Sequence, residues 1–157
     1  MNIKIRKFKD SDILGVVSLI KETFYKYNKK EATKTGIKNY LTYYSINKDN
    51  LEKVKISFLK TPIFFVALDN KKIVGMIRGT KSYMVNLFVN GNYHNQGIGR
   101  ELVNKFENEA KKQVSSEIKI RASLFAVPFY QKIGYKKTTG IKNYKGIKVY
   151  PMKKLIF

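Results

Sequence analysis

The chain has 157 residues and a hydrophobic fraction of 43%, which is the size and composition of about one globular domain with one buried core. It has no cysteine and one histidine, which excludes disulfide and thiolate chemistry and argues against a metal site. The 32 Lys and Arg residues against 11 Asp and Glu give a net charge of +21. This excess has two explanations: a polyanionic partner such as RNA, or compositional drift. We favour drift, because 28 of the basic residues are Lys, whereas proteins that recognise specific bases prefer Arg.

The first part of the chain is predicted to form one strand and three helices. Residues 3–8 alternate between apolar and polar, as in a strand, and their charges are unlike the apolar stretch of a signal peptide. Asp10 or Ser11 is expected to cap the next helix, and Asp49 the third. The apolar residues of the three helices recur at helical spacing: Ile13, Val16, Val17, Ile20, Phe24 and Tyr27, then Ile37, Tyr40, Leu41 and Tyr44, then Leu51, Val54, Phe58 and Leu59.

Strands dominate the prediction after Pro62, which stops the third helix. Residues 63–68 are the longest apolar run, and they are far shorter than the about 20 residues that span a membrane, so we expect no membrane contact and a cytoplasmic protein. The further expected elements are strands at 73–78, 82–89 and 117–122, a helix at 99–112, a short helix from Pro128 to Gly134, and a last hairpin of 135–139 with 147–152.

No linker interrupts this order, so residues 1–157 are expected to form a single domain with a mixed α/β (α+β) fold. The pentapeptide Gly-Ile-Lys-Asn-Tyr occurs twice, at 36–40 and 140–144, with helical flanks in the first copy and loop-like flanks in the second. Two copies without a sustained period do not make a structural repeat.

Residues 85–112 carry the clearest chemical signal, because an apolar strand runs through a glycine-rich turn directly into an amphipathic helix. The first N–H groups of a helix lack internal partners and lie at the positive end of its dipole, and glycines let an anion approach them. Such a unit suits a diphosphate, although a plain structural turn gives the same pattern. A Rossmann fingerprint is excluded because Leu102 stands where its third glycine belongs, and no P-loop sequence is present.

The register of residues 94–99 resembles the signature of the GNAT superfamily of N-acetyltransferases, Gln/Arg-x-x-Gly-x-Gly/Ala, with His94 at the first position. The resemblance implies a mostly antiparallel sheet of six to seven strands, four to five flanking helices, and a gap where the fourth and fifth strands splay apart. It implies acetyl-CoA as co-substrate. The residues implied to bind it are Leu87, Phe88 and Val89 at the pantetheine arm and His94, Asn95, Gln96, Gly97, Ile98, Gly99 and Arg100 at the diphosphate.

A second motif of the same family matches residues 123–135, with Ser123 in place of an Asn and Tyr135 in place of a Phe. The resemblance places Ser123, Tyr130 and Lys132 beside the cofactor. Tyr130 is the predicted general acid that returns a proton to the leaving thiolate, since a phenol with a pKa of about 10 suits a thiol leaving group. The alternative is that Tyr130 only packs in an aromatic cluster with Phe125, Phe129 and Tyr135.

The predicted reaction is transfer of the acetyl group from acetyl-CoA to a primary amine of a small molecule or protein by direct attack in a ternary complex. A backbone N–H of the strand is expected to polarise the thioester carbonyl. The general base stays open between Glu22, His94 and a water held by backbone carbonyls, since residues 82–89 contain no Asp or Glu.

The acceptor is expected to contact residues 24–50 and 139–148, whose Tyr and Lys residues suit an aromatic or anionic molecule, or form core and solvated rim. Two other functions stay open: an RNA-directed enzyme that acetylates aminoacyl-tRNA, and a non-catalytic acyl-CoA-binding module. A nucleic-acid partner is therefore an alternative that we do not favour. The sequence is compatible with a monomer or a homodimer.

Overall fold

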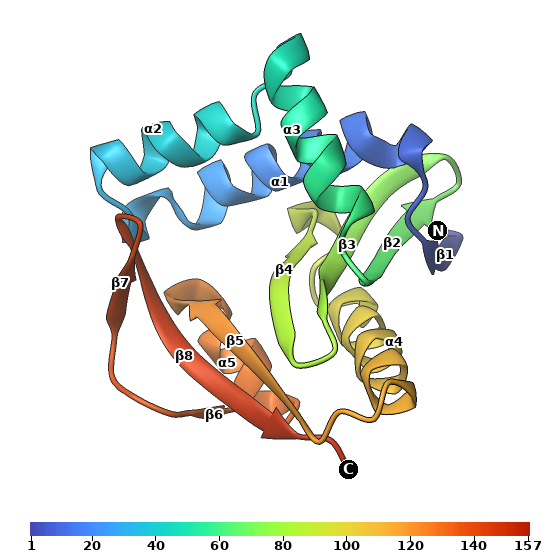
Figure 1. Cartoon of the computed structure of the whole chain (residues 1–157), viewed down its shortest axis with the longest axis vertical. Helices are drawn as coiled ribbons and strands as arrows, with labels where there is room; N and C mark the ends of the chain where they lie inside the picture. Colours follow the sequence, from blue (N-terminus) through green and yellow to red (C-terminus); the bar gives the residue numbers. More distant parts are fainter.

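One twisted sheet of eight strands organises the computed structural model, which describes residues 1–157 (Figure 1). The strands are β1 (Ile3–Lys7), β2 (Ile63–Asp69), β3 (Lys72–Thr80), β4 (Tyr83–Val89), β5 (Glu117–Ser123), β6 (Lys136–Lys137), β7 (Lys142–Tyr144) and β8 (Ile147–Leu155). They lie in the order β1-β2-β3-β4-β5-β8-β6, and β7 also pairs with β8. All neighbouring pairs are antiparallel except β4 and β5. The predicted mixed sheet is confirmed, with eight strands instead of six to seven.

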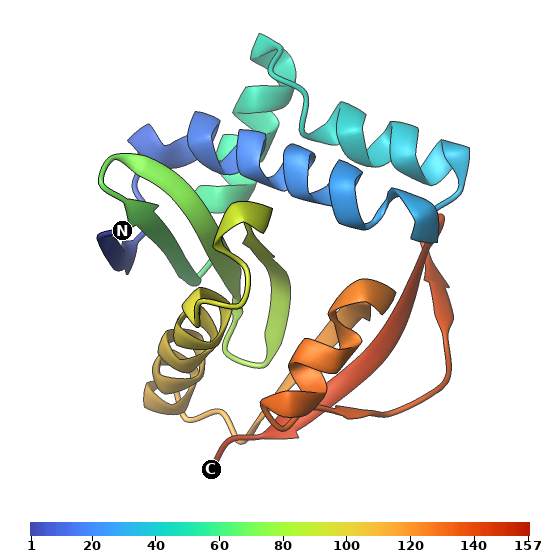
Figure 2. The ribbon, with the colours of Figure 1, turned by 180° about the vertical axis from the view of Figure 1, so that it is seen from behind.

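Five α-helices flank the sheet, in agreement with the prediction: α1 (Ile13–Tyr27), α2 (Lys34–Tyr43), α3 (Lys48–Leu59), α4 (Ile98–Lys112) and α5 (Val127–Lys132). Figure 2 shows α4 and α5 in front of the strands, whereas α1, α2 and α3 lie across the top of the view. No helix has the length and apolarity that a membrane crossing requires.

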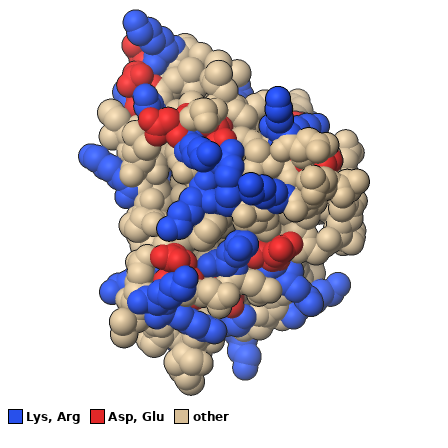
Figure 3. Space-filling model, turned by 90° about the vertical axis from the view of Figure 1, so that its right-hand side faces the viewer, with Lys and Arg blue, Asp and Glu red and all other residues tan.

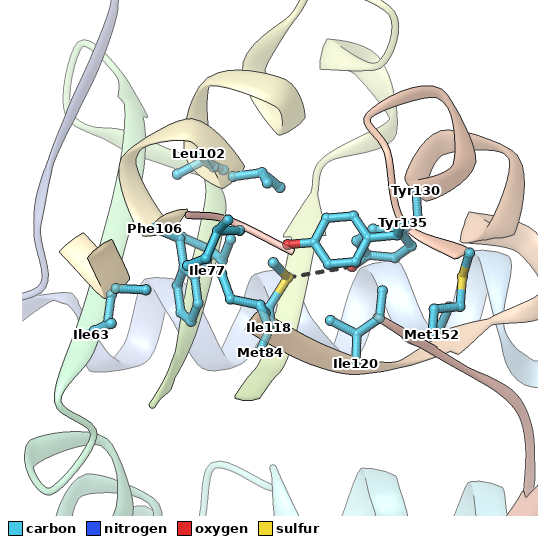
Figure 4. Packing of buried hydrophobic residues seen from close by; sticks show 14 of the residues in the cluster. Ile63, Ile77, Met84, Leu102, Phe106, Ile118, Ile120, Tyr130, Tyr135 and Met152 are labelled. Atoms are coloured by element: carbon cyan, nitrogen blue, oxygen red, sulfur yellow. Dashed lines mark hydrogen bonds between the residues drawn. The ribbon is translucent and has the colours of Figure 1, made fainter. Parts of the chain in front are cut away.

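Two hydrophobic clusters hold the helices to the sheet. The larger one joins α4 and α5 to both halves of the sheet, and Figure 4 shows its centre, where Phe106 of α4, Met84 of β4 and Ile120 of β5 pack together. The smaller one joins α1 and α3 to β2 and β3. Alternate residues of β2 enter different clusters, Phe64 the smaller and Ile63 the larger, which explains why this strand is a continuous apolar run.

The C-terminal half of the sheet has one covered face. The smaller cluster contains no residue of β5 or β8, so the side chains of β5 that point toward the α1 side stay exposed, among them Lys119 and Arg121. At the far end of this open face, the Thr33 N–H before α2 donates to the Gly146 carbonyl at 2.8 Å. Gly36 permits this approach, because a Cβ there would lie 2.7 Å from the Gly146 oxygen.

The fourth and fifth strands splay apart, as predicted. β4 and β5 pair through two residue pairs, Tyr83 with Lys119 and Met84 with Ile120, and then diverge. On its other side, β4 pairs with β3, where the register shifts so that Val85 is an extra residue, a β-bulge. A bulge bends its strand and increases its twist, which turns the rest of β4 away from β5.

Both predicted helix caps are wrong by two residues or fewer. Asp12, not Asp10 or Ser11, makes the hydrogen bond at the start of the first helical segment, where its carboxylate accepts the Lys9 N–H at 2.8 Å. Asn47, not Asp49, caps α3 and accepts the Asn50 N–H. In both places several polar residues stand in succession, and the backbone path decides which of them faces the free N–H groups.

Asp12 forms an ion pair with Arg6 in the N-terminal region. Its buried carboxylate accepts two hydrogen bonds from Arg6, at 2.7 and 2.9 Å, which tie β1 to α1. Burial by itself raises the pKa of Asp12, but the hydrogen bonds from Arg6 and the Lys9 N–H outweigh it, and the resulting pKa lies below the ordinary value.

Asp12→Asn is expected to lower the free energy of unfolding by about 2 kcal/mol at neutral pH. Because the folded-state pKa is depressed, this stabilisation is complete above the unfolded pKa of about 3.9 and is lost as the pH falls through the folded-state value. Urea unfolding from pH 7 to pH 2.5 measures this, with Asp10→Asn as the control because Asp10 is exposed and forms no ion pair. A difference that stays constant down to pH 2.5 contradicts the assignment.

Candidate active site

The turn from β4 into α4 presents a row of free backbone N–H groups. None of the N–H groups from Asn95 to Arg100 donates to a backbone carbonyl, and the first such bond of α4 joins the Glu101 N–H to Gly97 at 3.0 Å. No side chain caps this helix. The six donors lie at the positive end of the helix dipole, with the exposed side chain of Arg100 in the first turn. This arrangement can bind a polyanion such as a diphosphate.

The backbone conformation of this turn depends on Gly97. Its φ is +84° and that of Asn95 is +60°, both in the left-handed region that glycine and asparagine tolerate best. A Cβ at Gly97 would contact nothing within 4 Å, so conformation and not crowding requires the glycine. By contrast, Gly99 faces Phe129 of α5, whose Cζ would lie 3.2 Å from a Cβ there.

His94 points back toward β4 instead of along this row. Its Nε2 lies 2.7 Å from the Val89 carbonyl, which can only accept, so Nε2 carries the proton. The imidazole also packs against Tyr27, with ring centroids 5.0 Å apart. The structure therefore brings His94 next to the end of β4, and its predicted contact with the cofactor stays a prediction.

The gap between β4 and β5 has the predicted residues on both walls. Beyond Met84, the edge of β4 that carries Leu87, Phe88 and Val89 has no strand partner. On the opposite wall, the Ser123 hydroxyl accepts the Ala126 N–H at 3.2 Å and so caps the turn that leads into α5. Lys132, near the end of α5, is exposed.

Tyr130 projects from α5 into the narrow end of the gap. Its hydroxyl donates to the Met84 sulfur at 3.8 Å, and Met84 belongs to the last residue pair before the strands diverge (Figure 4). The ring also packs edge-on against Phe129 and Tyr135, two of the three predicted members of its aromatic cluster, whereas the third, Phe125, stacks on Tyr27 instead. Burial raises the pKa of Tyr130 above its ordinary value, which keeps the phenol protonated and able to donate at neutral pH.

Glu31 is a residue of the site that the sequence did not reveal. It lies in a 3₁₀ turn after α1, and its two carboxylate oxygens accept the N–H groups of Leu124 and Phe125 at 2.9 and 3.0 Å. Next to this contact, the rings of Tyr27 and Phe125 stack at 4.7 Å. These contacts join the two halves of the sheet across the open end of the gap. They link residues 93 and 94 positions apart, so no local pattern signals them.

The α1 side of the gap carries two arginines that form no ion pair. Arg78 of β3 is buried, donates to Asn86 of β4 at 2.8 Å and to Thr61 at 3.1 Å, and lies over the Phe58 ring. Arg121 of β5 is exposed, and its Cζ lies over two tyrosine rings, which Tyr144 and Tyr83 contribute.

Glu22 lies elsewhere. Its side chain lines an open cavity of about 680 Å³ between the start of α1, β1 and the β2–β3 turn. Four basic residues surround this cavity: Lys4, Arg6, Lys71 and Lys72. Figure 3 shows Lys and Arg side chains gathered on this side of the molecule. Glu22 therefore faces this cavity and not the gap between β4 and β5.

The sequence matches a family model described as an acetyltransferase (GNAT) domain over residues 28–156. The chain therefore belongs to the GNAT family of acetyltransferases. A comparison with curated protein sequences finds no match.

Solved structures share the fold along almost the whole chain. The PaiA N-acetyltransferase from Thermoplasma acidophilum in complex with coenzyme A has 20% identity and a TM-score of 0.79, covering 99% of both chains. A GCN5-related N-acetyltransferase from Rhodopseudomonas palustris has 15% identity and a TM-score of 0.81, covering 99% of this chain and 96% of that one. An aminoglycoside 6′-N-acetyltransferase complexed with coenzyme A has 18% identity and a TM-score of 0.71, covering 98% and 97%.

Glu31→Ala is expected to loosen the open end of the gap, because it removes the acceptors of two N–H groups. Hydrogen bonds to a charged group contribute about 1.5–3 kcal/mol, so hydrogen exchange at the Leu124 and Phe125 amides should accelerate about 10–100-fold. Glu22→Ala is the control, since it removes a carboxylate from the other cavity. Unchanged exchange at both amides would contradict the role of Glu31.

Proposed function

We propose that the protein transfers the acetyl group of acetyl-CoA to a primary amine of a small molecule or protein by direct attack in a ternary complex. The observation that carries this proposal is the row of six free N–H groups from Asn95 to Arg100, placed beside a gap between two strands of the sheet. An anion-binding turn next to an unpaired strand edge suits a ligand with a diphosphate at one end and an amide-containing arm at the other.

Different residues of the chain bind different parts of this ligand. The N–H groups from Asn95 to Arg100 hold the diphosphate, His94 lies beside it at the end of β4, and the Arg100 side chain adds a charge-assisted bond. The unpaired edge at Leu87, Phe88 and Val89 binds the amide-containing arm, with Ser123 and Lys132 on the α5 side. Acetyl-CoA supplies the activated acetyl group as a thioester. A backbone N–H of β4 donates to the thioester carbonyl where negative charge develops.

Tyr130 is the proposed general acid, supported by its place at the narrow end of the gap. Its hydroxyl already points to a sulfur atom, that of Met84, and burial keeps it protonated. In the reaction it donates its proton to the leaving thiolate. Glu22 faces another cavity, and Glu31 accepts two backbone N–H groups, so a water held by backbone carbonyls takes the role of the base.

Residues 1–157 act as a single acetyltransferase domain in the cytoplasm, as a monomer or a homodimer. The RNA-directed enzyme and the non-catalytic acyl-CoA-binding module stay as alternatives. Release of free CoA in assays with a panel of amines distinguishes an enzyme from the non-catalytic module. Measuring tRNA binding over a series of salt concentrations tests the RNA-directed enzyme, since phosphate contacts give a steep salt dependence.

Gly97→Leu is expected to abolish acetyl-CoA binding and to leave the protein folded, although the left-handed φ costs about 1–2 kcal/mol. For the wild type, a ligand at 100 times its Kd adds about 2.7 kcal/mol, which raises the Tm by about 5–10 °C in a chain of this size. Thermal unfolding with and without acetyl-CoA measures the shift.

The matched control for this experiment is Gly140→Leu. A Cβ at Gly140 meets nothing within 4 Å, and its φ is not positive, so the substitution adds the same side chain without strain. A full acetyl-CoA shift in the Gly97 variant would place the cofactor elsewhere.

Tyr130→Phe removes the hydroxyl and keeps the packing of the ring. If Tyr130 is the acid, kcat should fall about 100-fold while the affinity for acetyl-CoA stays near that of the wild type. Tyr135→Phe is the matched control, because Tyr135 lies in the same aromatic cluster and its hydroxyl donates to Glu107 at 3.1 Å. Loss of affinity at constant kcat would instead make the Tyr130 hydroxyl a cofactor contact.

A further inference from the structure

The α1 side of the gap, where an acceptor amine would meet the thioester, has an unbalanced positive charge. From residue 118 to the end of the chain there are ten Lys and Arg residues and no Asp or Glu, and of these Lys132 of α5 and Lys154, which binds Glu107 of α4, belong to the other face of the sheet. Residues 32–48, which include α2, also contain no acidic residue. The elements that border this side therefore repel a polycationic amine and attract an anionic one.

The two acidic residues that do border this side are already engaged. Glu117 at the start of β5 lies 3.7 Å from both Lys119 and Lys153. Glu31 accepts two backbone N–H groups. Neither carboxylate is left to bind a second ammonium group of an acceptor.

Arg121 is the cation best placed to bind an anionic group. It follows Ile120 directly, the last residue of β5 that pairs with β4, so it stands where the gap begins. Its side chain points to the α1 side, opposite to Ile120 and Ala122, which are buried in the larger cluster. The donor hydroxyl of Tyr130 approaches the same level of the sheet from the other side, through its contact with Met84.

The guanidinium of Arg121 is held in place by aromatic rings and not by an acid. Its Cζ lies 3.9 Å from the centre of the Tyr144 ring and 5.1 Å from that of Tyr83. Stacking uses the flat face of a guanidinium, while its N–H donors lie in the plane and stay available for a bidentate contact with a carboxylate. The two tyrosine rings therefore orient the guanidinium of Arg121 without neutralising its charge.

We infer that the acceptor is a small amine that also carries a carboxylate, and that Arg121, held between Tyr83 and Tyr144, binds this carboxylate at the narrow end of the gap. This inference rests on the proposed function, because it names the acceptor class of the same site. The remaining positive charge around the site lowers the pKa of the bound ammonium group, which favours the neutral amine that attacks. A polyamine or an aminoglycoside lacks the carboxylate and gains additional repulsion.

The test compares matched acceptors that differ by a carboxylate. The pairs are phenylalanine with phenethylamine, β-alanine with ethylamine, and 4-aminobutyrate with propylamine, assayed with acetyl-CoA by CoA release, with spermidine, kanamycin and aminoacyl-tRNA in the same panel. We expect kcat/KM to be at least about tenfold higher for the carboxylate member of one or more pairs. Arg121→Ala should remove this preference by raising KM, Tyr144→Phe should keep it, and Tyr144→Ala should weaken it.

Lys119→Ala is the charge-matched control, because it removes one positive charge from the same face of β5 at a residue that pairs with Glu117. It should retain the preference. A preference for spermidine, kanamycin or aminoacyl-tRNA, or an equal loss for both members of each pair in Arg121→Ala, overturns the inference. So does a complete absence of turnover and of calorimetric binding for every carboxylate amine in the presence of CoA.

The acetyl-CoA thermal shift separates these outcomes from failure of the proposed function. If the wild type shows the shift and acetylates other amines, the proposed acetyltransferase function is supported and the inferred acceptor class is wrong. If the shift is absent, the proposed cofactor site itself fails. Arg121→Ala should keep the shift, since Arg121 lies on the α1 side of the sheet and not in the turn before α4.

Discussion

The architecture of the site depends on the point where β4 stops pairing with β5. Two parallel residue pairs hold the strands together, and the extra residue Val85 then bends β4 away. A strand edge without a partner exposes backbone groups that require hydrogen bonds, and inside a protein they obtain them from a ligand or from water. The divergence therefore creates a gap through the sheet that is lined by polar backbone on one side and by α5 on the other.

The gap weakens the sheet, and two other features hold its halves together. On one face, the larger hydrophobic cluster continues without interruption from β2 and β3 through α4 to β5 and β8. On the other face, Glu31 binds the N–H groups of Leu124 and Phe125, and the Thr33 N–H binds Gly146. Apart from the contact of Arg121 with the Tyr83 ring at the narrow end of the gap, the α1 side is joined at this end, and the face between the two ends stays open.

Much of the site was predictable because its signals are local. The turn at residues 94–100 combines glycines with a helix start, and the structure shows six free N–H groups there. Tyr130 was predicted from the resemblance of residues 123–135 to a motif of the GNAT family, and the structure places it at the narrow end of the gap. The roles of Arg121 and Glu31 could not be predicted from the sequence. Each is a single charged residue without a local motif, and its contacts are with residues 23 to 94 positions away.

The repeated pentapeptide shows most directly what the sequence by itself determined and what the tertiary structure decided. Local patterns determined the strands, the amphipathic helices and the glycine-rich turn before α4, because these patterns act over a few residues. The same five residues are helical at 36–40, within α2, and end in the strand β7 at 140–144. In the first copy, Thr33 caps the helix by accepting the Gly36 N–H, whereas in the second, Lys142 to Tyr144 pair with β8. The same five residues thus adopt two different secondary structures because their tertiary neighbours differ, and packing outweighs the small intrinsic propensities of the residues.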